Sequence, residues 1–353
     1  MGNIASAAIA SKGISKEYWE CLIKYVKCHP EYWSLNGKPI LEYPLQVPLG
    51  VSMYEFLKDL FEKYHRLLNQ NIQEALNDVK IIDSIRKITK RISNTILSAL
   101  RLYYKGNVVK AYSVFAEMMK DIDQNYIPEK NVEYGQRFYR MRTELNKTDV
   151  KDFYHLPTSL RYKSGTMRFS ISGYPCFYIG YSKNVCQKEI SQKGSIISLS
   201  LKKGIRLKVF DLTFGKDQLE NQEKVGAFMA VFPLISACYI KMDEEISRNA
   251  KFQEEYIIPQ MLTSYLRNKT NYDGVCYFSV RNENLEPNGR EENDYRNLAL
   301  FTNVYIEDSI QGLIEDEMSK DFADCYMINC NKKNKEYDFI LMNNFEWYKP
   351  FNL

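Results

Sequence analysis

The N-terminal third of the chain has the spacing of apolar side chains that amphipathic helices require. Isoleucine, leucine and tyrosine recur at intervals of three or four positions over residues 81–103, with basic residues between them. This spacing predicts one long helix that buries a single face. Gly106 and Asn107 are typical of a helix end and a turn, and we expect a second helix to begin near Val109. The pattern indicates a small all-α helical bundle.

After residue 135 the pattern changes to short apolar runs separated by glycine and polar residues. Runs rich in Tyr, Phe, Ile and Val predict strands over residues 137–142, 176–180, 195–201, 206–210, 274–280 and 299–306. Helices are expected between them over residues 182–192, 222–239 and 249–267, the first with Ser182 as its N-cap. Because helices and strands alternate only in part, the pattern favours an α+β fold with a mixed sheet over a doubly wound sheet.

The polar segment 123–135, which contains Pro128, separates the two patterns. A chain of 353 residues is longer than one hydrophobic core usually serves. We therefore predict a helical domain of unknown role over residues 1–125. The second domain, over residues 126–353, would carry the functional site and a C-terminal extension.

Charge and cysteine content narrow the classes of partner. The 48 basic and 44 acidic side chains leave a formal charge of only +4, too small a field to indicate nucleic acid as a partner. The basic positions of residues 80–91 are more simply a solvated helix face, and nucleic-acid binding through them ranks last. The 8 cysteines form no CxxC pair and no cluster with zinc spacing, so we expect reduced thiols, no metal site and a cytoplasmic protein.

Membrane attachment is not expected to be stable. The longest apolar run, residues 227–240, is shorter than the roughly 20 residues that span a bilayer and contains Pro233, so we interpret it as a buried helix. The start MGNIAS fits the pattern for N-myristoylation, but no polybasic stretch follows to add a second anchor. We also expect no secretory signal peptide, because no apolar segment follows a basic N-terminal region.

Familiar catalytic patterns are absent from the sequence. It contains no GxGxxG or GxxxxGK[ST] loop, which argues against the common nucleotide-binding folds. The 3 histidines, His29, His65 and His155, lie near no nucleophile-elbow pattern, which argues against a Ser/His/Asp site. Only His155, in a turn that ends at Pro157, is kept as a residue that lines a substrate pocket.

Several short segments occur in an order that points to one family. They are Phe138-Tyr139-Arg140, Gly165-Thr166-Met167-Arg168-Phe169-Ser170, Phe177-Tyr178-Ile179-Gly180 with Glu189 eleven positions after Tyr178, Glu255-Tyr256-Ile257-Ile258-Pro259-Gln260, and Tyr272-Asp273-Gly274-Val275-Cys276-Tyr277-Phe278-Ser279. This series resembles the RES domain, a family named for an arginine, a glutamate and a serine. The resemblance covers about residues 136–304. One departure is Thr166-Met167-Arg168-Phe169-Ser170, which stands where the family has Gly-Gly-Arg-Trp-Asn.

The resemblance implies a fold similar to that of ADP-ribosylating toxins and cleavage of NAD at its N-glycosidic bond, by hydrolysis or phosphorolysis, without a cofactor. Arg140 and Arg168 would bind the pyrophosphate, because a guanidinium forms bidentate hydrogen bonds with phosphate. Tyr178 would lie against the nicotinamide ring. Glu189 would stabilise the oxocarbenium character of the ribose or activate the acceptor. Ser279 would bind the ribose or the carboxamide.

Further substrate-binding candidates are Tyr139, His155 and Arg161, and Arg142 is a spare for the arginine roles. The implied protein is a toxin or defence effector that depletes NAD in the cell. Two alternatives stay open: an ADP-ribosyltransferase that modifies a macromolecule, with residues 281–296 as an acceptor loop, and a module that senses NAD or ADP-ribose without turnover. An inhibitory antitoxin, another regulatory partner and a homo-oligomer are all compatible with the sequence.

Overall fold

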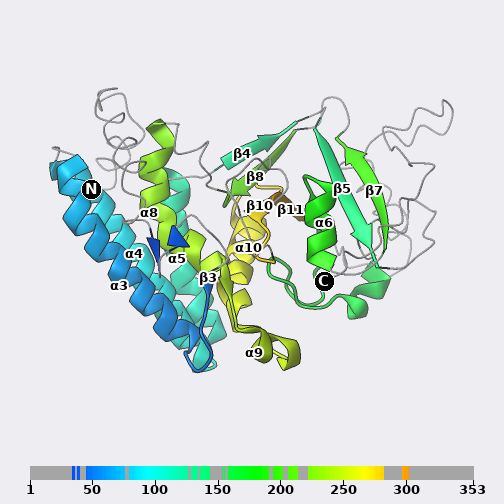
Figure 1. Ribbon diagram of the computed structural model, residues 1–353, viewed down its shortest axis with the longest axis horizontal. Helices are drawn as coiled ribbons and strands as arrows, with labels where there is room; N and C mark the ends of the chain where they lie inside the picture. Colours follow the sequence, from blue (N-terminus) through cyan, green and yellow to red (C-terminus); the bar gives the residue numbers. More distant parts are fainter. Residues whose placement is uncertain are drawn as a thin grey trace. The chain divides into compact units, whose positions relative to one another are not determined.

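We describe the fold from a computed structural model (Figure 1). It describes residues 34–35, 38–39, 45–75, 79–125, 129–133, 136–143, 153, 155, 158–190, 194–201, 206–213, 222–281 and 296–301. The MGNIAS start and most of the expected acceptor loop lie outside these residues. The chain divides into two compact units, each of which joins two segments. Unit 1 is Met1–Pro128 with Phe214–Tyr265, and unit 2 is Glu129–Thr213 with Leu266–Leu353.

Unit 1 contains the longest of the described helices. They are α3 (Met53–Ala75), α4 (Val79–Tyr104), α5 (Val108–Asn125) and α8 (Gln222–Cys238). In α4 the expected apolar stripe is buried at Ile85, Ile92, Ile96 and Leu100, which confirms the predicted amphipathic helix. α3 packs against one side of α4 and α5 against another, so the predicted bundle is present (Figure 1).

The turn between α4 and α5 follows the chemistry expected from its two residues. Gly106 has a φ of 76°, a left-handed conformation that glycine adopts without strain. Its N–H and that of Asn107 donate to carbonyls of the last turn of α4, at 2.8 and 2.9 Å. The Asn107 side chain then accepts from the Lys110 N–H at 3.3 Å and caps α5.

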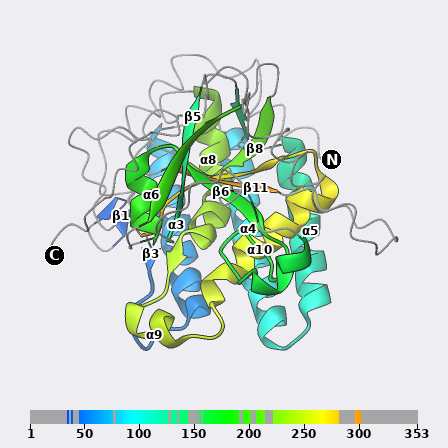
Figure 2. The same ribbon diagram turned by 90° about the vertical axis from the view of Figure 1, so that its right-hand side faces the viewer.

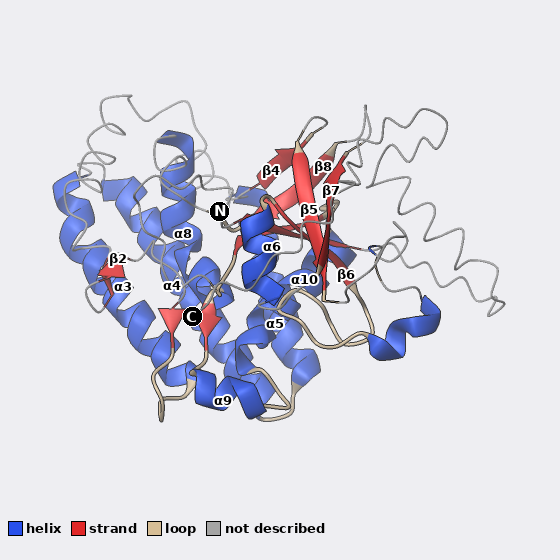
Figure 3. Ribbon diagram, turned by 45° about the vertical axis from the view of Figure 1, so that its right-hand side comes forward, coloured by secondary structure: helices blue, strands red, loops and turns tan. Residues whose placement is uncertain are grey.

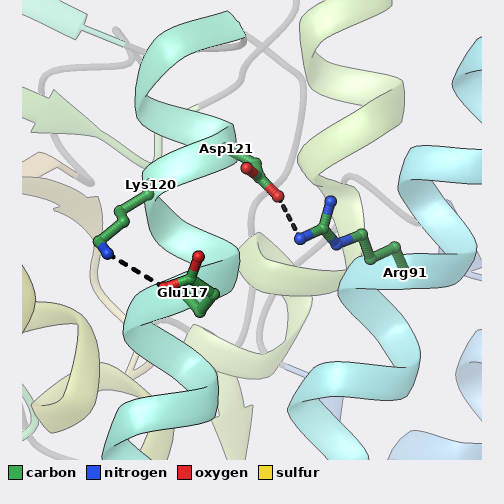
Figure 4. Close-up of polar contacts among 4 residues, drawn as sticks. All are labelled: Arg91, Glu117, Lys120 and Asp121. Carbon is green, nitrogen blue, oxygen red and sulfur yellow. Dashed lines mark hydrogen bonds and ion pairs between the residues drawn. The ribbon is translucent and has the colours of Figure 1, made fainter. Parts of the chain in front are cut away.

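One ion pair joins α4 to α5, and a second lies within α5. Arg91 pairs with Asp121 of the neighbouring helix, and Lys120 lies 3.0 Å from Glu117 within α5 (Figure 4). All four side chains are exposed, so each pair contributes little stability. In α4, Arg86 also donates to the Asn69 carbonyl at 3.1 Å. Part of the basic face of residues 80–91 is therefore engaged within the unit.

The apolar run at residues 227–240 forms the centre of unit 1. Every residue from 230 to 240 is buried, and Pro233 lies inside α8, which confirms the predicted buried helix. α8 packs against α4, and the Phe232 ring lies 4.2 Å from that of Tyr64 in α3. After α8, strand β9 (Ile240–Lys241) pairs in parallel with β3 (Leu45–Gln46). Among the described helices, none has both the length and the apolar character to cross a membrane.

The division into two units does not correspond to a single boundary along the chain. The sequence predicted one boundary at residues 125/126, whereas the segment Phe214–Tyr265 packs with the N-terminal helices. The physical reason is α8, whose surface is apolar on all sides, so that it must pack against other helices. α3 and α4 pack against it. The smaller elements of unit 1 are β1 (Ser34–Leu35), β2 (Lys38–Pro39), α9 (Glu244–Asn249), η4 (Glu254–Tyr256) and most of α10 (Ile257–Lys269).

Unit 2 is built on a mixed sheet of seven described strands in the order β4-β8-β10-β11-β6-β5-β7. Figure 3 labels five of them, β4, β5, β6, β7 and β8, in red. The strands are β4 (Glu129–Val132), β5 (Arg137–Arg142), β6 (Cys176–Gly180), β7 (Ser195–Ser200), β8 (Leu207–Asp211), β10 (Gly274–Phe278) and β11 (Arg296–Phe301). Within this sheet, β8 and β10 are the one pair of described strands that run in parallel. The six predicted strands are confirmed, β4 was not predicted, and the α+β class holds.

The two faces of this sheet differ. One face, here the core face, carries Phe138, Phe177, Cys276 and Leu298 in the main apolar cluster of unit 2. The other face is covered by helix α6 (Lys183–Ile190) over β5 and β6, and we call it the α6 face (Figure 2). Side chains alternate between faces along a strand, so neighbours of the core residues lie on the α6 face.

Candidate active site

Helix α6 brings Glu189 onto the sheet, and its start is set by a local cap. Ser182 accepts the Val185 N–H at 3.2 Å, which confirms Ser182 as the N-cap. Val185 and Cys186 are buried against the sheet, and the Cys186 thiol donates to the Tyr139 carbonyl at 3.2 Å. Burial raises the pKa of Cys186 to about 12, so the thiol keeps its proton and acts as a structural contact.

Gly180 lets α6 approach closely. A methyl group at this position would lie 2.5 Å from Val185 Cγ1 and 2.7 Å from Cys186 Sγ, both in the first turns of the helix. Since both side chains are buried, they have no free space into which to move. The distance between α6 and the end of β6 therefore depends on glycine.

We expect Gly180→Ala to destabilise unit 2 by about 1–3 kcal/mol, because overpacking at a closed contact displaces the helix. Thermal denaturation of the variant measures this. The matched control is Gly165→Ala, where a methyl group would meet nothing within 4 Å. Equal melting temperatures for the two variants would contradict the close approach.

A row of directly opposed residues crosses the α6 face. Tyr139 on β5 lies opposite Gly180 on β6, Gly180 opposite Asn297 on β11, and Asn297 opposite Tyr277 on β10. Opposed residues point to the same side of a sheet. The row therefore lies on the α6 face, and the Asn297 amide reaches the helix: its Nδ2 donates to Glu189 Oε1 at 2.8 Å.

Arg281 contacts the other oxygen of the Glu189 carboxylate. The Arg281 Nε is 3.7 Å from Glu189 Oε2, and the Arg281 side chain is 54% exposed against 30% for Glu189. The Arg281 N–H donates to the hydroxyl of Ser279 at 3.3 Å. Arg281 thus contacts both predicted residues, Glu189 through its side chain and Ser279 through its backbone N–H.

Tyr178 binds the turn that carries Arg168. Residues Met167 and Ser170 exchange two backbone hydrogen bonds of 3.2 Å, which closes a tight turn with Arg168 buried at its second position. The Tyr178 hydroxyl lies 2.9 Å from the Ser170 hydroxyl and accepts the Phe169 N–H at 3.2 Å. The Tyr178 hydroxyl therefore holds the turn that carries Arg168 against β6.

Arg140 lies on the core face, away from Glu189. It is buried, its guanidinium lies 4.3 Å from the centre of the Phe177 ring, and Nη1 donates to the Tyr178 carbonyl at 2.5 Å. Burial, and secondarily the charge of Arg142, lower the pKa of this guanidinium. The structure does not place Arg140 on the same face as Glu189, and its predicted role in substrate binding stays a prediction.

The remaining candidates are less closely defined. Tyr139 is half-buried on the α6 face, in the row of opposed residues. His155 is buried in unit 2. Arg161 lies in the 3-10 helix η3 (Thr158–Lys163), with its side chain outside the described part. Arg142 ends β5. Among the described residues, no group of three or more His, Cys, Asp or Glu is arranged to hold a metal ion.

The sequence alone did not identify Asn297 or the contact of Arg281 with Glu189. The predicted last strand began at residue 299, and Arg281 and Arg296 were assigned to an acceptor loop. Observed β11 begins at Arg296, so that Asn297 is inside the sheet. A single amide directly before the apolar residues 298–301 was the available signal, since a buried polar group in a strand usually has a specific partner.

Comparison with known proteins gives two matches and one absence. The model of the RES domain family matches residues 137–317, which is just over half of the chain. The chain is also 27% identical over 286 residues to "Putative toxin YopC" of Bacillus subtilis (strain 168), an alignment that covers 70% of this chain and 62% of that protein. The chain therefore covers less than two thirds of the relative's own length. No solved structure matches the chain significantly.

Proposed function

Because the chain belongs to the RES domain family, we propose that it cleaves the bond between nicotinamide and ribose in NAD and acts as a toxin. The observation that best supports this proposal is the placement of Glu189. Its carboxylate is held over the sheet by Asn297, contacts Arg281, and remains partly open to solvent. A fixed and accessible carboxylate is the group that glycosidic bond cleavage requires.

In the proposed reaction the bond between the nicotinamide nitrogen and the ribose carbon breaks, and the electron pair leaves with nicotinamide. Positive charge then develops on the ribose, and the Glu189 carboxylate stabilises it. A water molecule or a phosphate supplies the oxygen that forms the new bond to this carbon. The products are nicotinamide and ADP-ribose, with a proton released, in the first case, and nicotinamide and ADP-ribose phosphate in the second.

The substrate would lie across the α6 face with its pyrophosphate toward Arg168. The guanidinium of Arg168 supplies charge and paired donors for phosphate oxygens, and the Tyr178 hydroxyl fixes the turn that carries it. Ser279 would orient the ribose or the carboxamide next to Glu189. Arg281 is exposed enough to move from Glu189 to a phosphate when substrate enters.

The toxin role rests on the family and on the name of the relative from Bacillus subtilis. A protein that depletes NAD harms the cell that contains it, so we also propose an inhibitory or regulatory protein partner. The N-terminal helices, which lie before the matched residues 137–317, could contribute to such control.

The test is NAD consumption by the purified full chain, with and without inorganic phosphate, with the products separated by chromatography and identified by mass. Loss of NAD with release of nicotinamide supports the proposal. Formation of ADP-ribose phosphate only when phosphate is present identifies phosphorolysis, and ADP-ribose in both conditions identifies hydrolysis. Arg168→Ala should raise KM, because the residue is assigned to substrate binding.

Two other outcomes would point to the alternatives. Transfer of labelled ADP-ribose to a protein or nucleic acid from a cell lysate would indicate an ADP-ribosyltransferase. NAD binding without any turnover, in the presence of phosphate and lysate, would contradict the enzyme proposal and favour a sensor.

A further inference from the structure

We infer that Asn297 is a positioning residue for the reaction: its amide holds the Glu189 carboxylate in the orientation that acts on the ribose. This inference rests on the proposed function. The hydrogen bond from Asn297 Nδ2 to Glu189 Oε1 is 2.8 Å long, a distance typical of a well-formed N–H···O bond. An ionised carboxylate only accepts, so the amide must present its NH₂ group to Glu189.

The sheet fixes Asn297 more firmly than any loop residue near the site. β11 lies between β10 and β6 and pairs with both over five residues each. Asn297 is 4% exposed, with Tyr277 opposite on one side and Gly180 on the other. Its side chain thus rises from the middle of the sheet, next to Gly180, which α6 approaches closely. A donor that is fixed before substrate arrives needs no reorganisation during the reaction.

Glu189 needs such a donor because of its place in α6. The helix ends at Ile190, so the carboxylate lies in the last turn, where the backbone carbonyls carry partial negative charge. A carboxylate is less favourable there than at a helix start. Of the two contacts described, the one to Arg281 is 3.7 Å long and exposed, and exposed ion pairs contribute little. The buried amide of Asn297 is the contact that can hold the carboxylate in one orientation.

The experiment compares Asn297→Leu, which removes the donor at similar size, with wild type in steady-state NAD cleavage. We expect kcat to fall about 10- to 100-fold, the loss of one hydrogen bond to a charged group, with KM nearly unchanged. Asn297→Asp is the second variant, because it keeps the shape and should give the same fall in kcat. Thr213→Val removes a buried hydroxyl that bonds to Asp211, and is the control that should lower melting temperature but not kcat.

A double-variant cycle separates positioning from a general effect on folding. In a Glu189→Gln background, measured in single turnovers with enzyme in excess, Asn297→Leu should have little further effect, because its partner carboxylate is already gone. Equal losses in both backgrounds, or an unchanged kcat for Asn297→Leu and Asn297→Asp in an active enzyme, would overturn the inference alone. A wild type that does not cleave NAD would overturn the proposed function and this inference with it.

Discussion

Glu189→Gln is expected to lower kcat for NAD cleavage by about 100- to 1,000-fold, because it removes the negative charge that stabilises the ribose cation. The substitution keeps the shape of the side chain and an oxygen that can accept from Asn297 Nδ2, which lies 2.8 Å away in the native protein. Folding and NAD binding should therefore persist. The measurements are NAD turnover, melting temperature and the Kd for NAD.

The matched control for this variant is Glu133→Gln in the same unit. Glu133 is an exposed glutamate that pairs with Arg206 at 3.1 Å. Its replacement should leave turnover at the wild-type rate. A Glu189→Gln protein that is folded and cleaves NAD as fast as wild type would remove Glu189 from the chemistry and leave the NAD reaction to another group.

Phe232→Ala is expected to cost about 3–5 kcal/mol of the free energy of unfolding, a large part of the stability of an ordinary domain. The Phe232 side chain is fully buried in α8 and packs on Tyr64 of α3 at 4.2 Å. For the same reason a shortened chain that lacks residues 1–125 should aggregate, because α8 would lose the helices that cover it. Denaturant unfolding of the variant and the solubility of the shortened chain are the measurements.

Val109→Ala is the control, since Val109 is 81% exposed in the same unit and should change stability by less than about 0.5 kcal/mol. A soluble and cooperatively folded chain of residues 126–353 would show that the second part is an independent domain, as the sequence pattern first suggested. It would contradict the stabilising role assigned here to α3 and α4.

Local features of the fold could be predicted from the sequence. The stripe over residues 81–103, the Gly106 turn and the Ser182 cap each depend on residues close in the chain, so periodicity and capping rules were sufficient. The helices that pack against α8 could not be predicted. A helix that is apolar on all sides indicates that it is buried, but its sequence does not specify which helices cover it.

The site was predictable in part for a similar reason. The spacing between Tyr178 and Glu189 depends only on one strand and the helix that follows it, so local rules were sufficient to identify this segment. The face on which Arg140 lies could not, because β5 has buried side chains on both faces and alternation alone does not label them. Asn297 was missed because its partner, Glu189, is 108 positions away and only strand pairing brings the two together.

The interleaving of the two units also has a consequence for synthesis. Proteins are made from the N-terminus, and a continuous domain can fold while the rest of the chain is still on the ribosome. Here unit 1 needs the segment Phe214–Tyr265, and unit 2 needs residues from Leu266 onward. Asn297 and Ser279 belong to this late segment. A nascent or prematurely ended chain therefore lacks the assembled site, so that the proposed activity would arise in a cell only after translation has passed β11.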